Sequence, residues 1–206
     1  NGLSQTGYLN ENTYEMLLSL ASRQRTTGSV DSGTNATESI IAKTSPDSRL
    51  SRVRRVFPGK DLVVGNFDGR LYVVVLTWSS HSLAEARALA RRSGGTLASI
   101  TSAAEYDFVM KLAQSDSRLW TSDDPEHRHG PSIGLYQSKG AREPSGGWVW
   151  DSGESYTLNR WTRSEPNNHD GGEDVAALWI KNGGGGRTVG WNDTKGISRS
   201  FIIEIP

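Results

Sequence analysis

The sequence predicts an α+β fold in which two amphipathic helices precede a mostly antiparallel sheet. Serine–glutamate capping boxes at Ser82 and Ser102 each open a run of apolar residues at helical spacing, which predicts the two helices. After residue 119 this periodicity ends, and short apolar runs separated by turn residues predict strands instead. A polar stretch from Asp151 to Asp174 is too long for an ordinary connection, which indicates a functional loop among the strands.

The composition excludes several classes of function. Lys and Arg number 23 and Asp and Glu number 23, so the net charge gives no argument for nucleic acid or an anionic membrane as a partner. No apolar run approaches the length of about 18 residues that a membrane-spanning helix needs. Cysteine is absent, which excludes disulfides, thiolate nucleophiles and cysteine-based zinc sites. The chain begins at Asn1 without a methionine or a signal peptide, so we expect a fragment or a processed form.

Three segments are expected along the chain. Residues 1–22 form a helical remnant or a capping segment, and Asn1–Thr13 resembles the end of a peptidoglycan-binding-type helical module. Residues 23–60 are rich in Ser, Thr, Gly and Arg and lack sustained periodicity, which predicts a linker or an extended arm. The arginines of this segment are interpreted as solvated, because no aromatic residues are interleaved with them. Residues 61–206 form the main domain.

The main domain begins with two strands and the two helices. Leu62–Val64 and Leu71–Leu76 are β-prone runs on either side of a turn at residues 66–69. Gly94 and Gly95 end the first helix, because glycine adopts the left-handed conformation of a helix C-cap at little cost. The strands expected after the helices are Ile133–Tyr136, Trp148–Trp150, Val175–Ile180, Thr188–Trp191 and Phe201–Ile205.

The stretch Glu165–Asp174 carries the strongest functional signal. Carboxylates and carboxamides surround one proline and two glycines, and an apolar run from Val175 follows directly. Calcium takes about six to eight oxygen ligands, so hard oxygen ligands on a stiffened loop beside a strand indicate a calcium site. Trp191-Asn192-Asp193 follows another apolar run and could close the same site.

The order and spacing of the motifs from residue 66 to residue 206 resemble those of a C-type lectin-like domain. The matching motifs are Tyr72, the two helices around Gly94–Ile100, Ile133-Gly134-Leu135, Trp148-Val149-Trp150, Asn159-Arg160-Trp161, Glu165-Pro166-Asn167, Glu173-Asp174, Trp191-Asn192-Asp193 and Phe201–Glu204. The resemblance implies the fold of that family, with two helices, mostly antiparallel strands and a long calcium-binding loop.

The resemblance also implies the site residues. The calcium ligands would be Glu165, Asn167, Glu173, Asn192 and Asp193, and the first four would also hold the sugar. The Glu-Pro-Asn motif implies a cis bond before Pro166, which is inexpensive only before proline, at about 0.5–1 kcal/mol. The motif further implies that vicinal hydroxyls of mannose-, glucose- or fucose-type sugars ligate Ca²⁺ directly. One such site binds weakly, so several copies in an oligomer would add avidity.

Two features depart from the family pattern. Ser132 stands where the family usually has a tryptophan, and the positions of the family's cysteines are occupied by Ala90, Val175, Gly196 and Ile203. Each missing disulfide removes roughly 2–4 kcal/mol of stability. We therefore expect additional packing, involving the arm at 23–60 or bound metal, to compensate. The absence of cysteine suggests a bacterial source.

The implied function is calcium-dependent carbohydrate binding without catalysis, in a secreted or cell-surface protein of an extracellular or periplasmic space. The alternative is a lectin-like module that binds a protein, in which calcium only orders the long loop. An enzyme is disfavoured, because no nucleophile is paired with a base and the carboxylates serve better as ligands.

Other polar clusters are weaker candidates. Asn168 and Asp174, together with Asp170, could hold an auxiliary metal ion. A transition-metal site at His127 and His129 is disfavoured against a solvated loop. Further interpretations assign Trp161 and Trp191 to the core rather than to sugar stacking, and Gly183–Gly186 to a hairpin loop beside the site.

Overall fold

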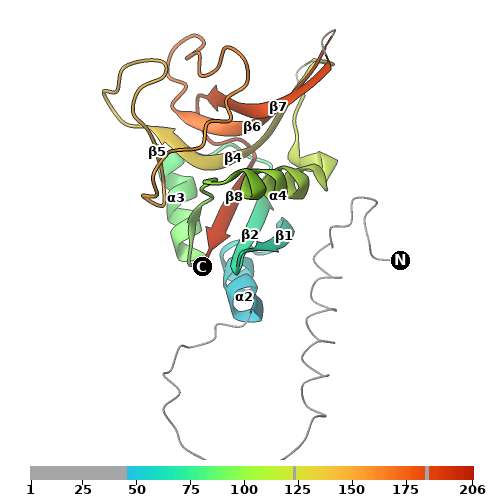
Figure 1. Cartoon of the computed structure of the whole chain (residues 1–206). Coiled ribbons are helices and arrows are strands. Elements are labelled where there is room, and N and C mark those ends of the chain that lie inside the picture. Colours follow the sequence, from blue (N-terminus) through green and yellow to red (C-terminus); the bar gives the residue numbers. More distant parts are fainter. Residues whose placement is uncertain (1–45, 123, 184–185) are drawn as a thin grey trace, which may run out of the picture.

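The computed structural model describes residues 46–122, 124–183 and 186–206 (Figure 1). The helix expected in residues 1–22 and residues 23–45 of the expected linker lie outside the described residues. The described part contains three α-helices, one short 3₁₀ helix and eight strands. In order these are α2 (Pro46–Val56), β1 (Asp61–Phe67), β2 (Arg70–Leu76), α3 (Leu83–Arg92), β3 (Thr96–Leu97), α4 (Ala103–Gln114), η1 (Ser117–Leu119), β4 (His127–Gln137), β5 (Trp148–Trp150), β6 (Val175–Gly183), β7 (Gly186–Thr194) and β8 (Ser200–Ile205).

The strands form one sheet in the order β1-β2-β8-β4-β6-β7, with β3 paired to β8 and β5 paired to β4. Every pairing is antiparallel except a single parallel contact between Ser132 of β4 and Phe201 of β8. The predicted α+β class with a mostly antiparallel sheet is therefore confirmed. In Figure 1 the helices lie around β1, β2 and β8, whereas the long loop lies at the other end, over β5, β6 and β7.

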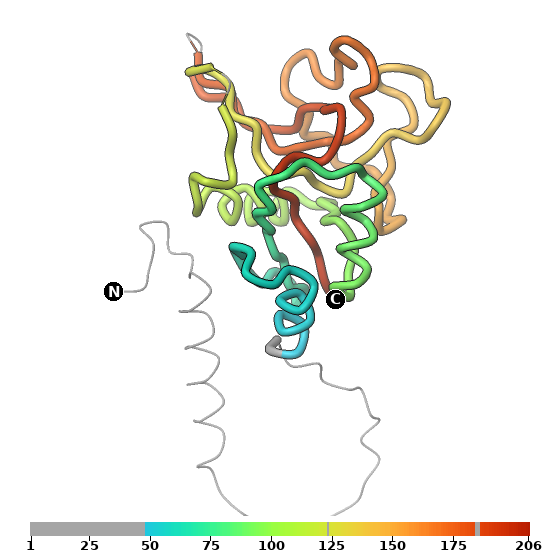
Figure 2. The backbone as a smooth tube through the Cα atoms, turned by 180° about the vertical axis from the view of Figure 1, so that it is seen from behind, coloured from blue at the N-terminus to red at the C-terminus, as the bar shows by residue number. Residues whose placement is uncertain are grey.

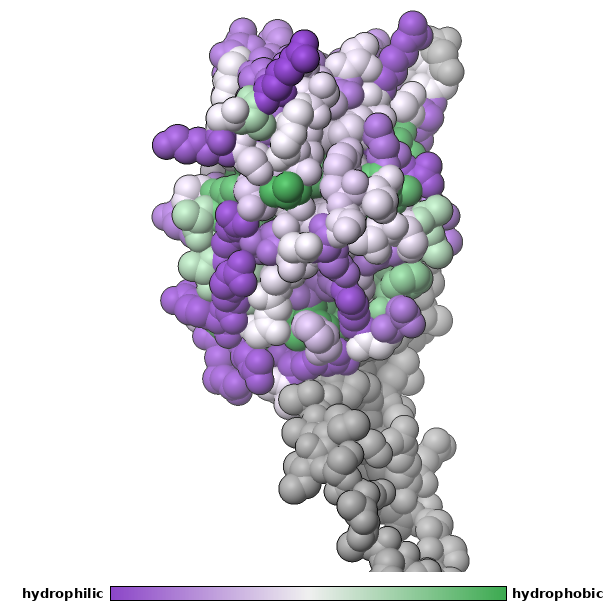
Figure 3. Space-filling view, turned by 60° about the vertical axis from the view of Figure 1, so that its left-hand side comes forward, coloured by the Kyte–Doolittle hydropathy of each residue, from purple (hydrophilic) through white to green (hydrophobic). Residues whose placement is uncertain are grey.

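Strand β2 is buried on both faces, and this sets the positions of the helices. Its side chains alternate, so the set that begins with Tyr72 packs in a cluster with α4. The set that begins with Leu71 packs in a second cluster with α2 and α3. The unbroken apolar run of this strand is what a strand covered on both sides requires. On the face drawn in Figure 3, apolar residues are scattered in small patches among polar ones.

The two predicted helices begin at the predicted capping residues, but only one capping box is complete. At α3, the Glu85 amide donates to the Ser82 hydroxyl at 3.2 Å, and the Ser82 amide donates to the Glu85 carboxylate at 2.8 Å. At α4, Glu105 instead accepts hydrogen bonds from the Thr101 amide at 2.7 Å and from the Tyr72 hydroxyl. The buried carboxylate of Glu105 thereby joins β2 to the segment just before α4, without bonding to the amide of the N-cap residue Ser102.

Helix α2 lies within the range expected to be a linker or an extended arm, and it is instead a packed element. Leu50 and Val53 are fully buried in the cluster that contains α3. Arg49 is also buried, so not every arginine of this segment is solvated. Its guanidinium donates to the carbonyls of Gly69 at 2.9 Å and Ile205 at 3.4 Å. Figure 2 shows the end of β8 close to α2, in agreement with these contacts.

No helix among the described residues is long and apolar enough to cross a membrane.

We expect Leu50→Ala to lower the free energy of unfolding by about 2–5 kcal/mol, because it removes a fully buried side chain between α2 and the sheet. Arg55→Ala on the exposed side of the same helix is the matched control, with an expected change within about 0.5 kcal/mol. Urea denaturation followed by circular dichroism measures both. Equal stability of the two variants would contradict the packing of α2 on the domain.

Candidate functional site

The long loop between β5 and β6 is seated directly on strand β7. The Trp191 amide donates to the Arg160 carbonyl at 2.8 Å, and the Thr162 amide donates to the Trp191 carbonyl at 3.0 Å. Gly190 permits this close approach, because a Cβ added there would lie 2.5 Å from the Arg160 carbonyl oxygen. The loop therefore continues the sheet by a short parallel bridge between Trp161 and Trp191.

Aromatic packing also fixes the long loop to the strands of the sheet. Trp161 meets Trp148 edge to face, with ring centroids 4.6 Å apart, and its indole donates to the Tyr156 hydroxyl at 2.9 Å. Trp191 is fully buried and meets Trp150 edge to face at 5.6 Å. The interpretation of Trp191 as a core residue is confirmed, and its burial excludes it as a sugar-stacking surface. Trp161 is half-buried and packs against the same cluster.

The Asp193 carboxylate joins the two segments that the sequence predicted to meet. It lies at the end of β7, is fully buried, and accepts hydrogen bonds from the backbone amides of Asn167 at 3.1 Å and Asn168 at 2.7 Å. Asn192 precedes it in β7 and is half-buried. The long loop and the Trp-Asn-Asp segment are thus in direct contact, which is the proximity that a shared site requires.

Glu165 lies at the centre of this site. The Glu165–Pro166 bond is cis, as the resemblance implied. One carboxylate oxygen of Glu165, Oε2, is buried and has no hydrogen-bond partner among the described residues. Burial, a hydrogen bond with Asp193 and the negative charges of Asp193 and Glu173 raise the pKa of Glu165 to about 7. Burial also raises the pKa of Glu173, and the charge of Asp193 adds to this effect.

These residues fit a hard cation by their chemistry. The five predicted ligands supply only oxygen atoms from carboxylates and carboxamides, which is the donor type that calcium prefers. A cation would offset the repulsion between the carboxylates and would occupy the unpartnered Glu165 oxygen. The described residues contain no ready-made cluster of three or more His, Cys, Asp or Glu for a metal ion. Instead, Asp193 accepts from backbone amides, and Glu173 accepts from the His169 amide at 2.6 Å.

The residues proposed for an auxiliary metal ion do not converge in the described structure. The amide oxygen of Asn168 accepts from the Glu173 backbone amide at 3.0 Å, and Asp170 is exposed beside His169. Asp174 lines a separate hollow, together with His81. At the disfavoured transition-metal site, the His127 ring lies 2.8 Å from the Asp124 carboxylate.

A threonine hydroxyl occupies the region in which the resemblance places two cysteines. Thr194 Oγ1 lies 3.2 Å from the Val175 carbonyl and 2.9 Å from the Gly196 carbonyl. The other two cysteine positions, Ala90 and Ile203, are fully buried in the same apolar cluster as α2. Hydrogen bonding and apolar packing therefore replace covalent links at both places.

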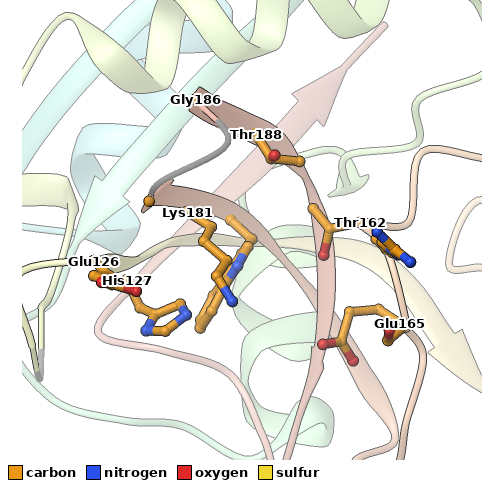
Figure 4. Close-up of a pocket in the computed structure, with 11 residues that line it drawn as sticks. Glu126, His127, Thr162, Glu165, Lys181, Gly186 and Thr188 are labelled. Atoms are coloured by element: carbon orange, nitrogen blue, oxygen red, sulfur yellow. The ribbon is translucent and has the colours of Figure 1, made fainter.

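A hollow of about 500 Å³ opens beside Glu165 (Figure 4). Its lining includes Trp179 and Lys181 of β6, His127 of β4 and Thr188 of β7. The sequence analysis did not single out Trp179 or Lys181. The signal was the alternation along β6, in which Trp179 and Lys181 share one face, but the partners on that face depend on sheet register.

Comparison with known proteins identifies the family. Residues 79–199 match the model of the Lectin C-type domain, which is more than half of the chain. The chain therefore belongs to the C-type lectin domain family. Human lithostathine has a similar fold, with a TM-score of 0.51 at 20% identity over 69% of this chain and 96% of that one.

Two curated relatives have recognisable sequence similarity. Ladderlectin of Oncorhynchus mykiss is 30% identical over 112 residues, which are 54% of this chain and 52% of the relative. C-type lectin lectoxin-Lio3 of Erythrolamprus poecilogyrus is 32% identical over 122 residues, which are 59% of this chain and 65% of the relative. The chain thus matches less than two thirds of the length of either relative. Both relatives and the family are described as lectins and not as enzymes, which agrees with the prediction of no catalysis.

We expect the Glu165 carboxyl to titrate near pH 7 in the calcium-free protein, measured by carbon NMR in the presence of a chelator. The folded-state pKa lies above the ordinary value of 4.5, so Glu165 stabilises the fold at low pH and this contribution is lost as the pH rises to 7. Asp193→Asn should lower the pKa of Glu165 by removing a neighbouring charge. Asp170→Asn, at an exposed position of the same loop, is the control and should leave it unchanged. A value near 4.5 in the unchanged protein would contradict the packing of these carboxylates.

Proposed function

We propose that the protein binds carbohydrate in a calcium-dependent manner through Glu165, Asn167, Glu173, Asn192 and Asp193. The observation that carries this proposal is the unpartnered, buried carboxylate oxygen of Glu165 beside the carboxylates of Asp193 and Glu173. Negative charges held together in this way repel one another, and a calcium ion would offset that repulsion. With Ca²⁺ bound, the three carboxylates leave a net charge near minus one, which suits a moderate affinity for calcium.

The bound ion would supply coordination positions that two vicinal sugar hydroxyls can occupy. The chain's own side chains then read the orientation of the sugar. The carboxylates of Glu165 and Glu173 accept hydrogen bonds from the hydroxyl protons, and the NH₂ groups of Asn167 and Asn192 donate to the hydroxyl oxygens. The Glu-Pro-Asn order supports a preference for mannose-, glucose- or fucose-type diols.

The setting of this activity follows from the same proposal. Because a single site of this kind binds weakly, we expect the protein to act in several copies, as an oligomer or on a multivalent surface. A requirement for calcium favours a secreted or cell-surface location, extracellular or periplasmic. The bacterial source inferred from the absence of cysteine stays a prediction, and both named relatives come from eukaryotes.

We expect calcium to raise the melting temperature relative to a chelator, because a ligand at 100 times its Kd stabilises the folded state by about 2.7 kcal/mol. Glu165→Ala should abolish this shift, whereas Asp170→Asn should retain it. A glycan array with and without calcium then shows whether sugar is bound. The absence of a calcium shift would contradict the site. A shift without any calcium-dependent glycan signal would favour the alternative, a protein-binding module in which calcium orders the loop.

We expect the double substitution Glu165→Gln and Asn167→Asp to change the preference from mannose-type to galactose-type sugars, because it exchanges an acceptor and a donor around the diol. Competition with methyl α-mannoside and methyl β-galactoside, both in calcium, measures the change. The single variant Asn167→Gln keeps the NH₂ donor but displaces it. It is the control and should weaken the binding of both sugars. Loss of all binding by the double variant would count against the diol mechanism.

A further inference from the structure

One face of the three strands β4, β6 and β7 forms the floor of the hollow beside Glu165. Residues paired across a sheet project to the same face, and so do residues two apart along a strand. The register of the three strands therefore defines two adjacent rows on this face. The rows are His127–Lys181–Thr188 and His129–Trp179–Gly190.

The indole of Trp179 is held in a fixed orientation on this floor. The His129 ring meets it edge to face, with centroids 4.2 Å apart at 90°, and the His127 ring lies at 5.3 Å with a tilt of 35°. Trp179 is half-buried and lines the hollow, so part of its surface remains accessible. An aromatic ring that is already ordered gives contact area at low cost in conformational entropy.

The long loop forms the wall that separates this floor from the calcium site. Gly190, opposite Trp179, has no side chain, and Thr162 of the loop covers it, with Cγ2 2.7 Å from the position of an added Cβ. The Glu165 amide donates to the Thr162 carbonyl at 3.0 Å, which closes a turn between the wall and the predicted calcium ligand. Both Thr162 and Glu165 line the hollow, so the hollow extends up to Glu165, the predicted calcium ligand.

Polar groups surround the accessible aromatic surface. Figure 4 shows the Lys181 side chain extending into the hollow between His127 and Glu165. Thr188 and Glu126 add a hydroxyl and a carboxylate to the lining. An apolar ring face bordered by donors and acceptors matches a pyranose, which carries C–H groups on its faces and hydroxyls around its edge.

We propose that this hollow is a second saccharide subsite, in which Trp179 stacks on the ring next to the one held at the calcium site. The proposal rests on the proposed function and makes the ligand an oligosaccharide rather than a single terminal sugar. The volume of about 500 Å³ lies within the range of about 300–1,000 Å³ typical of small-molecule sites, which is consistent with room for a further sugar ring.

The test compares methyl α-mannoside with α-linked mannobiose and mannotriose by isothermal titration in calcium. We expect the unchanged protein to bind an oligosaccharide more tightly than the monosaccharide. Trp179→Ala should remove this gain, a change of roughly three- to tenfold for an aromatic contact, and should leave monosaccharide affinity unchanged. Trp78→Ala is the matched control, because Trp78 is 56% exposed and lies outside the hollow, and it should retain the gain.

A second variant tests the subsite without changing Trp179, whose removal could also disturb the packing of the sheet. Thr188→Trp places a large side chain in the hollow from an exposed position of β7, and it should block the oligosaccharide gain while monosaccharide binding and the calcium shift persist. Tryptophan emission gives a separate readout, because the oligosaccharide should perturb it more than the monosaccharide does, and only where Trp179 is present.

The outcomes separate this proposal from the one on which it rests. Calcium-dependent monosaccharide binding without any oligosaccharide gain would overturn the subsite alone, as would a gain that survives both Trp179→Ala and Thr188→Trp. Absence of all calcium-dependent saccharide binding in the unchanged protein would overturn both proposals.

Discussion

The close seating of the long loop on strand β7 is the contact on which the candidate site depends. Backbone hydrogen bonds at Arg160 and Thr162 fix the loop to Trp191, and the glycine beside Trp191 gives the backbone room to approach. Two residues further along β7, Asp193 binds the amides of the loop's other arm. Strand β7 thus holds both arms of the loop. The loop has little apolar content of its own, so these hydrogen bonds to a packed strand are what fix its shape.

The same strand separates two kinds of environment. Trp191 faces the aromatic core, whereas Thr188 lines the hollow with the exposed row of β6. Glu165 lies where the wall of the hollow meets the buried carboxylates. Its environment is therefore partly aqueous and partly apolar, and burial is the first cause of its raised pKa. A proton or a cation near this carboxylate would offset the repulsion from Asp193 and Glu173.

Much of this arrangement could be predicted from the sequence, because capping residues, alternating apolar runs and motif spacing are local patterns. The capping serines, the strands and the association of Glu165 with Asp193 all followed from spacing or from the family resemblance. Helix α2 was missed because its buried apolar residues, Leu50 and Val53, are interspersed with arginines that dominate the local composition. The second capping box is only half formed: the Ser102 hydroxyl accepts from the Glu105 amide, but the Glu105 carboxylate has a tertiary partner in Tyr72, which no local pattern encodes. Trp179 became visible only through the register of three strands, which is a non-local property.

The threonine hydroxyl between Val175 and Gly196 has a consequence for the chemical environment in which the fold can persist. A link made by hydrogen bonds neither forms by oxidation nor breaks by thiol exchange. The shape of the loop is therefore independent of redox potential, and so is the apolar cluster that contains Ala90 and Ile203 at the other two cysteine positions. Folding of the domain therefore requires neither an oxidant nor a disulfide isomerase.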